Sequence, residues 1–193
     1  MTNNAATKNK QQRIVGFCGP KRAGKSTAGL ILDRGDNPWA KHEMSDTMRS
    51  IVEDAIGFKM TDAYYEQTKD TQMVLESISK ATFRDFYIAI GQGLRKYVSP
   101  NIHSNIFKER IEEASLNDKD IYTPSIRFDA EARMINEAGG IIIEIVRDGY
   151  SYNRVDPTER GIYRNHITYC VRNNGNKSDL WSSVMETIEY HYG

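Results

Sequence analysis

The sequence has few cysteines and prolines, no long apolar run and no excess charge of either sign. It contains 2 cysteines and 5 prolines in 193 residues, and 26 basic side chains balance 26 acidic ones, so the net charge is zero. No segment approaches the roughly 18 consecutive apolar residues of a membrane span, and the isoleucine run 141–143 is interrupted by Glu144. Balanced charge gives no indication of nucleic-acid binding. We therefore expect a cytoplasmic protein with neither a nucleic-acid nor a membrane partner.

The two cysteines and the polar N-terminus bound the organisation of the chain. Cys18 and Cys170 each lie in an apolar segment typical of a strand, so we expect buried free thiols in a reducing compartment rather than a disulfide. Residues 1–12 are polar throughout and are expected to form a disordered tail. The remaining length, residues 13–193, is that of a single domain.

Short apolar runs alternate with longer amphipathic segments. Such alternation is typical of an α/β fold in which helices cover both faces of a mostly parallel sheet. The expected strands are residues 13–18, 39–44, 121–126, 140–146 and 166–171. The expected helices are residues 26–33, 45–56, 82–98, 103–115, 129–138 and 178–190, within a pattern that is helical from 61 to 116.

Helix ends and one apolar stripe can also be predicted. Ser45 and Ser178 are expected N-caps, and Gly57 should end the helix that Ser45 begins. In helix 82–98 apolar side chains recur at steps of three and four residues, which is most simply a core-facing stripe. Its members are Phe83, Phe86, Tyr87, Ile90, Leu94 and Val98.

Residues 19–26, GPKRAGKS, match the phosphate-binding pattern G-x-x-x-x-G-K-[ST] without a mismatch. The motif lies between an expected strand and an expected helix, where glycines let backbone N–H groups turn toward a phosphate at a helix N-terminus. Lys25 would reach the β and γ phosphates of ATP, and the Ser26 hydroxyl would ligate Mg²⁺. The expected nucleotide-binding residues are Gly19, Lys21, Ala23, Gly24, Lys25, Ser26, Thr27 and, near the base, Asn173.

Two short strings resemble GTPase motifs, and neither has the right context. Residues 176–179 spell N-K-x-D, but they lie too near the C-terminus to leave room for another strand and base-contacting loop. Residues 54–57 spell D-x-x-G inside a helical pattern instead of at a strand end. The simpler interpretation of the first string is that Ser178 and Asp179 cap the last helix.

Arginines outside the phosphate loop indicate a second anion. A kinase whose acceptor is phosphorylated must offset the repulsion between two phosphates with Mg²⁺ and guanidinium groups. Arg127 directly follows an expected strand, and Arg95 follows Gly91 and Gly93, which would allow close approach of a ligand or backbone. Further arginines in the expected lid, residues 148–165 and the position just before it, are Arg147, Arg154, Arg160 and Arg164.

The segment TPSIRFDAEA, residues 123–132, followed by GGII at 139–142, resembles the P-D-V-R-F-x-x-E-A…GG-x-[IV] signature of phage-type deoxynucleoside monophosphate kinases. Looser likenesses follow in the family's order. Residues 45–49 (SDTMR) are similar to A-D-P-L-K, 90–95 (IGQGLR) to I-G-T-E-x-x-R, 156–159 (DPTE) to the lid segment H-x-S-E, and 173–175 (NNG) to N-x-G.

The resemblance covers about residues 13–190 and implies an adenylate-kinase-like fold and transfer of the γ phosphate of ATP to a deoxynucleoside monophosphate, in host cytoplasm if the gene is a phage's. It implies that Arg95 and Arg127 act in catalysis with Lys25, and that a helical region at about 45–116 binds the acceptor. The implied acceptor-binding residues are Asp46, Arg49, Arg95, Arg127, Glu131 and Glu159.

The chain departs from the family pattern at three places. Ser125 stands where the family has an aspartate that supports Mg²⁺ through water, so Asp129 or Asp148 would have to replace it. Asn105 lies near the position of an expected tryptophan, and Asp156 replaces the lid histidine. The four histidines have no metal-ligand spacing and need no chemical role.

Two alternative functions stay open from the sequence. One is another small-molecule P-loop kinase, similar to dephospho-coenzyme A kinase. The other is a nucleotide-binding module without catalysis, in which Ser125 replaces the supporting aspartate. The accepted base, the sugar preference and assembly as a homodimer are left open as well.

Overall fold

The computed structural model describes residues 11–193 except 44, 58, 62–63, 65–66, 69–81 and 157, and the side chains of Thr47 and Ile56. The described chain divides into two compact units. The first contains the residues up to His42 together with Lys108–Gly193, and the second is Glu43–Phe107. The predicted tail, except residues 11 and 12, lies outside the described residues. None of the described helices is long and apolar enough to cross a membrane.

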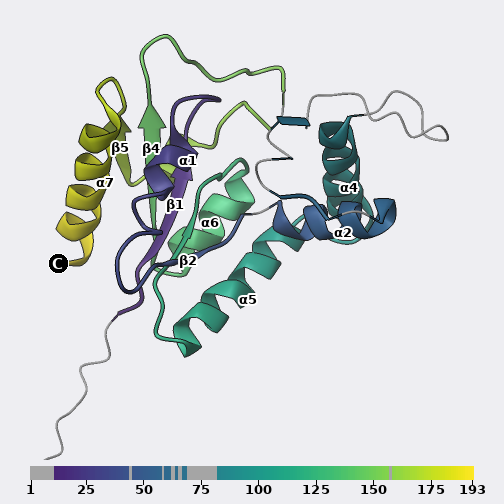
Figure 1. The fold of residues 1–193 in the computed structure, drawn as a ribbon, viewed down its shortest axis with the longest axis horizontal. Coiled ribbons are helices and arrows are strands. Elements are labelled where there is room, and N and C mark those ends of the chain that lie inside the picture. The colour runs from purple at the N-terminus through teal and green to yellow at the C-terminus, as the bar shows by residue number, and fades with distance from the viewer. Residues whose placement is uncertain are drawn as a thin grey trace, which may run out of the picture. The chain divides into compact units, whose positions relative to one another are not determined.

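The first unit is built on a five-stranded sheet of order β2-β3-β1-β4-β5, in which every neighbouring pair is parallel (Figure 1). The α/β fold class predicted from the sequence is confirmed. The strands are β1 (Ile14–Cys18), β2 (Ala40–Lys41), β3 (Ile121–Thr123), β4 (Ile141–Val146) and β5 (Tyr169–Arg172).

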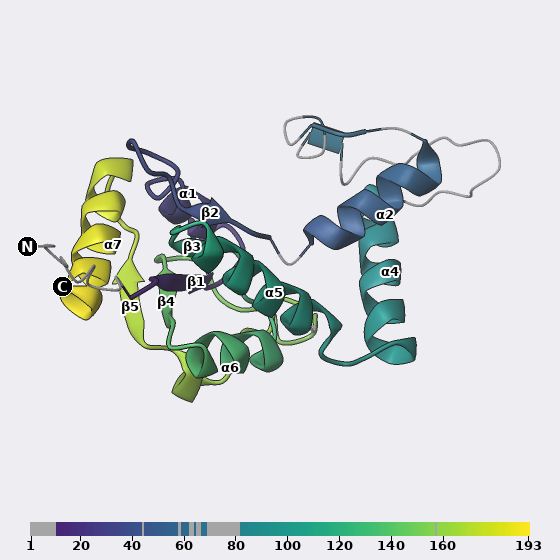
Figure 2. The ribbon, with the colours of Figure 1, turned by 90° about the horizontal axis from the view of Figure 1, so that it is seen from below.

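Helices cover both faces of this sheet, as Figure 2 shows. On one face α1 (Lys25–Gly29) and α7 (Lys177–Tyr192) pack against apolar side chains of β1, β4 and β5, including Phe17 and Ile143. On the other face α6 (Asp129–Glu137) lies close to the sheet because Gly16 and Gly140 leave room for Ile135. Burial of these apolar side chains on both faces provides the main stabilisation of the unit.

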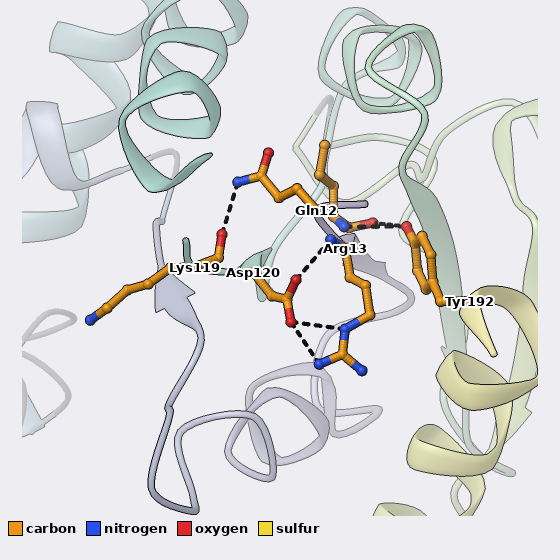
Figure 3. A network of polar contacts seen from close by, with 6 residues as sticks. Gln12, Arg13, Lys119, Asp120 and Tyr192 are labelled. Carbon is orange, nitrogen blue, oxygen red and sulfur yellow. Dashed lines mark hydrogen bonds and ion pairs between the residues drawn. The ribbon is translucent and has the colours of Figure 1, made fainter. Parts of the chain in front are cut away.

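A polar network closes the end of the sheet opposite the phosphate loop (Figure 3). The buried Asp120 carboxylate accepts from the backbone N–H of Arg13 and from its guanidinium, the shorter ion-pair distance being 2.6 Å. The Gln12 amide donates to the carbonyls of Ile111 and Lys119, and the Tyr192 hydroxyl donates to the carbonyl of Ile14. These contacts tie the start of β1 to the segment before β3 and to α7.

The second unit is helical. It contains α2 (Asp46–Ile56) and α4 (Phe83–Tyr97), and the start of α5 (Ile102–Leu116), whose remainder belongs to the first unit. Gly57 ends α2 with φ +69°, as predicted. The predicted stripe on α4 is confirmed for Phe83, Phe86, Tyr87 and Ile90, which pack around Val52. Val98 is instead 65% exposed, because it follows the last turn of the helix.

Several predicted boundaries are wrong for local reasons. The strand expected at 121–126 ends at Thr123 because Pro124 has no N–H to donate, although Ile126 N–H still donates to Phe17 O at 2.8 Å. Near the start expected for β5, residues 164–166 form a 3₁₀ turn. Thr168 bonds Ile142 of β4 in two ways: its backbone N–H donates to the Ile142 carbonyl at 2.9 Å, and its hydroxyl, in place of a backbone carbonyl, accepts from Ile142 N–H at 3.1 Å.

Two further expectations need correction. The cap of α7 is Asn176, whose side chain accepts from the N–H groups of Ser178 and Asp179, so Ser178 is not the cap. Both cysteines are free, but only Cys18 is buried. Cys170 is exposed because β5 is the edge strand, and of its residues only Val171 is buried.

Candidate functional site

The phosphate loop connects β1 to α1 and is held open by two glycines with positive φ. At Gly19 (φ +138°) an added Cβ would lie 2.2 Å from the carbonyl oxygen of Ile145, and at Gly24 (φ +107°) it would lie 2.2 Å from the amide nitrogen of Asn173. Only glycine combines a positive φ with so short a distance to neighbouring atoms without strain, because it has no Cβ. Gly19 is therefore required by its contact with β4, and Gly24 by its contact with the Asn173 side chain, as well as by the loop itself.

Lys25 is the first residue of α1 and its side chain folds back over the loop. Its ammonium group donates to the carbonyls of Gly19 at 2.8 Å and Pro20 at 2.9 Å. Partial burial lowers the pKa of Lys25; the nearby Glu159 carboxylate opposes this shift and the Arg127 guanidinium adds to it. Glu159 and Arg127 thus lie within electrostatic reach of the lysine.

Asn173 lies after β5 and braces the loop. Its side-chain amide donates to Ala23 O at 2.8 Å, and Ala23 itself is fully buried. The indole of Trp181, on α7, donates to Thr27 O at 2.7 Å. The loop is therefore fixed from the β5–α7 side by two side chains. The sequence analysis expected Asn173 near the nucleotide base and gave it no role in bracing the loop.

A cleft of about 410 Å³ opens beside the loop, within the first unit. The loop and α1 form one side through residues 22 and 24–27, and Arg147, Asn173 and Lys177 lie on the other. Among the described residues that line it, four are cationic and none is acidic; the cations are Arg22, Lys25, Arg147 and Lys177. A cleft with this charge favours a polyanion such as a triphosphate.

The described residues of this site fit a magnesium ion. Ser26 and Thr27 line the cleft directly after Lys25, and hydroxyl oxygen is among the hard ligands that Mg²⁺ accepts together with phosphate oxygens and water. Of the two carboxylates considered as substitutes at Ser125, Asp129 accepts from Tyr163 N–H at 2.6 Å. Asp148 lies 4.0 Å from the Arg172 guanidinium, and both side chains are exposed.

Arg127 follows the carboxyl end of β3, next to the strand that leads into the phosphate loop. Its backbone N–H and that of Phe128 both donate to the Glu131 carboxylate, at 2.9 and 3.1 Å. Glu131 is only 2% exposed, so it holds the backbone at the start of α6 while the Arg127 side chain stays exposed. The family resemblance implied a place for Glu131 in the acceptor pocket, and the structure shows its hydrogen bonds to the Arg127 and Phe128 backbone.

Asp46, Arg49 and Arg95 belong to the second unit and are described within it. Asp46 begins α2 and accepts from Glu43 N–H, and Arg95 lies in the last turn of α4. An added Cβ at Gly91 would lie 2.6 Å from the Met48 sulfur and 3.6 Å from the Arg95 guanidinium. The close approach expected at Gly91 is therefore made by the side chain of Met48, whereas Gly93 has open space around its Cα.

Two arginines from the expected lid and the position just before it make different contacts. Arg147 lines the cleft, and Arg164 pairs with the buried Glu144 of β4 at 2.7 Å. In the same segment the pKa of Asp156 is lowered, first by hydrogen bonds from Thr158 and further by the charges of Arg127 and Lys21. The DPTE segment therefore lies within electrostatic reach of the phosphate loop; its Pro157 is outside the described residues.

Sequence reasoning did not assign roles to Arg22, Lys177 or Glu144. Arg22 occupies a variable position of the phosphate-loop motif and Lys177 lies near the C-terminus, and only the folded cleft brings the two cations together. Glu144 did leave a signal, because it is a single carboxylate within the otherwise apolar strand IIIEIV. A charge in a strand predicted to be buried requires partners.

Comparison with solved structures agrees with this fold. The chain is similar to dephospho-CoA kinase from Campylobacter jejuni, with 13% sequence identity, a TM-score of 0.53, and coverage of 93% of this chain and 96% of that one. Mycobacterium tuberculosis APS kinase CysC, as a Cys556Ala mutant, also matches at 12% identity, over 92% and 97% of the two chains, with a TM-score of 0.46. The first likeness shows that the chain has the fold of a P-loop kinase.

No protein-family model matches the chain. A search of curated proteins finds no match either.

Proposed function

We propose that this protein is an ATP-dependent kinase that transfers the γ phosphate of ATP to the 5′ phosphate of a deoxynucleoside monophosphate, forming the diphosphate and ADP. The observation that carries the proposal is the cationic cleft beside a phosphate loop whose Lys25 lies in electrostatic reach of Arg127. The choice of a deoxynucleotide acceptor is supported by the sequence resemblance.

The donor triphosphate would bind along the loop. Lys25 would exchange its contacts with the Gly19 and Pro20 carbonyls for contacts with phosphate oxygens. Because partial burial lowers its pKa, an adjacent anion would favour the charged form. Asn173 and Lys177 lie on the other side of the cleft and would face the nucleoside. Mg²⁺, held by Ser26 and phosphate oxygens, would supply charge neutralisation.

The acceptor phosphate would meet Arg127 at the edge of the sheet. A phosphate oxygen is already ionised near neutral pH, so no general base is needed, and catalysis depends on positioning and charge stabilisation. Glu131 fixes the backbone of Arg127 through its two hydrogen bonds. Arg95, Asp46 and Arg49 are proposed to complete the acceptor site, with Glu159 from the lid segment.

The test is a coupled assay of ADP release. Purified protein with ATP and Mg²⁺ is offered the four deoxynucleoside monophosphates and the four ribonucleoside monophosphates in turn. We expect release that depends on a deoxynucleotide, with product diphosphate confirmed by mass. ATP binding without release from any acceptor would support a non-catalytic nucleotide-binding module and contradict the proposal.

A second candidate acceptor is dephospho-CoA. Its support is the structural likeness to a dephospho-CoA kinase over 93% of this chain. The same assay discriminates, because release with dephospho-CoA and with none of the eight nucleotides would replace the first proposal with the second. Release with neither class would exclude both.

A further inference from the structure

Glu144 is a buried carboxylate on β4 that the proposed chemistry does not use. It is 5% exposed and lies in register between Cys18 of β1 and Cys170 of β5. Neither neighbour compensates its charge, and burial together with Glu144 raises the pKa of the Cys18 thiol to about 12. A buried carboxylate is costly unless it is paired and hydrogen-bonded, so a cation that compensates its charge has to come from outside these strands.

Both partners come from the connection between β4 and β5, and from opposite arms of it. The Tyr152 hydroxyl donates to Glu144 Oε1 at 2.8 Å, and the Arg164 guanidinium donates to Oε2 at 2.7 Å. Tyr152 lies in the arm that leaves β4 and Arg164 in the arm that returns to β5. One carboxylate therefore clamps the two arms of the connection against the sheet, one on each oxygen.

The two arms also contact each other above this clamp. An added Cβ at Gly161, whose φ is +83°, would lie 2.8 Å from the Tyr152 ring. Asn153 N–H donates to Glu159 O at 3.1 Å, which closes the intervening residues into a small loop. The returning arm is held again where Tyr163 N–H donates to Asp129. The described residues of loop 153–160, all except residue 157, thus stand on a fixed base.

The loop carries charges that act on the phosphate loop. Glu159 is within electrostatic reach of Lys25, and Asp156 is within reach of Lys21 and Arg127. The base of the loop is tied to the same region, because Glu144 pairs in register with Cys18, the residue before Gly19. The clamp and the loop it supports therefore flank the end of β1 where the phosphate loop begins.

We propose that Glu144 is a positioning residue, which clamps Tyr152 and Arg164 so that loop 153–160 is placed against the phosphate loop for phosphoryl transfer. This inference rests on the proposed function. Glu144 acts through the loop and does not touch ATP or the acceptor. Misplacement of a catalytic segment by about 1 Å can cost on the order of a hundredfold in rate, so a positioning role has a measurable consequence.

The test compares Glu144→Gln with Asp120→Asn as a matched control. Asp120 is also a buried carboxylate paired with an arginine (Figure 3), but it precedes Ile121, at the end of the sheet where β1 and β3 begin. We expect Glu144→Gln to lower kcat at least about tenfold while KM for ATP changes less than about threefold. Asp120→Asn should lower stability and leave both constants near wild type.

Trypsin provides a readout that does not depend on activity. Arg154 and Arg160 are exposed cleavage sites within the loop. In Glu144→Gln, cleavage at these two sites, followed by mass spectrometry under conditions where the protein is folded, should be at least about tenfold faster than in wild type. Cleavage in Asp120→Asn should match wild type. Equal cleavage and equal kcat in wild type and Glu144→Gln would overturn the proposal.

A double variant separates positioning from stability. Glu144→Gln with Arg164→Met removes both charges, so no charge is left uncompensated in the clamp, and stability should recover relative to Glu144→Gln. Recovery of kcat together with stability would mean that Glu144 is merely structural and would overturn the proposal. If Glu144→Gln does not fold, Tyr152→Phe, which removes one hydrogen bond, takes its place with the same expectations in smaller degree.

Failure of the proposed kinase function can be distinguished from failure of the proposal for Glu144. It would show as absence of ADP release from wild-type protein with every acceptor. The cleavage comparison then decides the clamp alone, because faster loop cleavage in Glu144→Gln supports it and equal cleavage overturns it.

Discussion

At the scale of single residues, the site depends on a few positions where the backbone conformation and the neighbouring atoms restrict which residue type fits. Gly19 and Gly24 are fixed by contacts with Ile145 and Asn173, and Lys25 by the carbonyls it bridges. The phosphate-loop motif could be recognised in the sequence because the groups that bind phosphate come from consecutive residues. Its bracing by Asn173, 150 positions away from Ala23, became visible only in the fold.

Gly19→Ala should destabilise the protein by at least about 2 kcal/mol, since the new methyl group would meet the Ile145 carbonyl and the backbone has positive φ. Gly35→Ala is the matched control, because its φ is +92° but nothing lies within 4 Å. Urea unfolding should show roughly 1 kcal/mol for the control. Equal losses in the two variants would mean that the close approach to β4 is unimportant.

Lys25→Ala and Arg127→Ala should each lower turnover by at least about a hundredfold with the fold intact, because each removes a cation that stabilises charge in phosphoryl transfer. Arg110→Ala is the control, since it removes an exposed arginine whose partner is Glu113 on the same helix. The ADP-release assay measures turnover, and circular dichroism checks that each variant is folded. Wild-type turnover in either of the first two variants would remove that residue from the mechanism.

At the scale of elements, periodic apolar patterns located the helices and strands, and local hydrogen bonds decided their ends. Helix α1 illustrates the limit, because the pattern 26–33 predicts two turns and the structure has Lys25–Gly29. After Gly29 the bonds tighten, with Leu32 N–H donating to Gly29 O. Helix α7 extends to Tyr192 and begins from Asn176 because this side chain reaches two free N–H groups.

The cap of α4 gives a test at this scale. Thr82 accepts from Asp85 N–H, and the Asp85 carboxylate accepts from Thr82 N–H at 2.7 Å. Thr82→Ala should therefore cost about 1 kcal/mol of unfolding free energy. Ser45→Ala at the start of α2 is the control, because the Ser45 side chain makes no capping hydrogen bond. The denaturant midpoints of the two variants and the wild type give the comparison. Similar losses of stability in Thr82→Ala and Ser45→Ala would contradict the cap assigned to Thr82.

At the scale of the whole molecule, the parallel sheet brings the carboxyl ends of β1 and β3 together. This places Arg127 beside the phosphate loop although about a hundred residues separate them, as doubly wound folds do in general. The sequence placed Arg127 directly after an expected strand, at the edge where doubly wound folds bind ligands, and the strand order itself comes from the structure. The sequence did not predict the cationic cleft or the clamp at Glu144, because both depend on side chains from three or more separate segments.

The pH dependence of stability is a property of the whole molecule to which His103 contributes. Burial, with the nearby Arg95 charge, lowers the pKa of His103 below its usual 6.5. The unfolded chain therefore binds a proton first as pH falls, so stability is lost between pH 6.5 and the lower folded-state pKa. The slope contributed is at most about 1.4 kcal/mol per pH unit.

His103→Gln should flatten this part of the profile. Urea unfolding of wild type and variant at pH 7 and at pH 5.5 gives the comparison, and the difference between the two proteins should shrink or change sign at the lower pH. The other histidines are present in both proteins, so their titration cancels. A parallel loss of stability in both proteins would contradict the assignment to His103.

The sequence by itself determined the α/β class, the phosphate loop and the spacing of most strands and helices, because these follow from periodicity and from a motif of eight consecutive residues. Only the tertiary structure decided which distant cations line the cleft, why Glu131 holds a turn and where Glu144 finds its partners. Contacts between segments depend on the register and packing of the sheet, and a linear pattern of residue types does not encode these position by position.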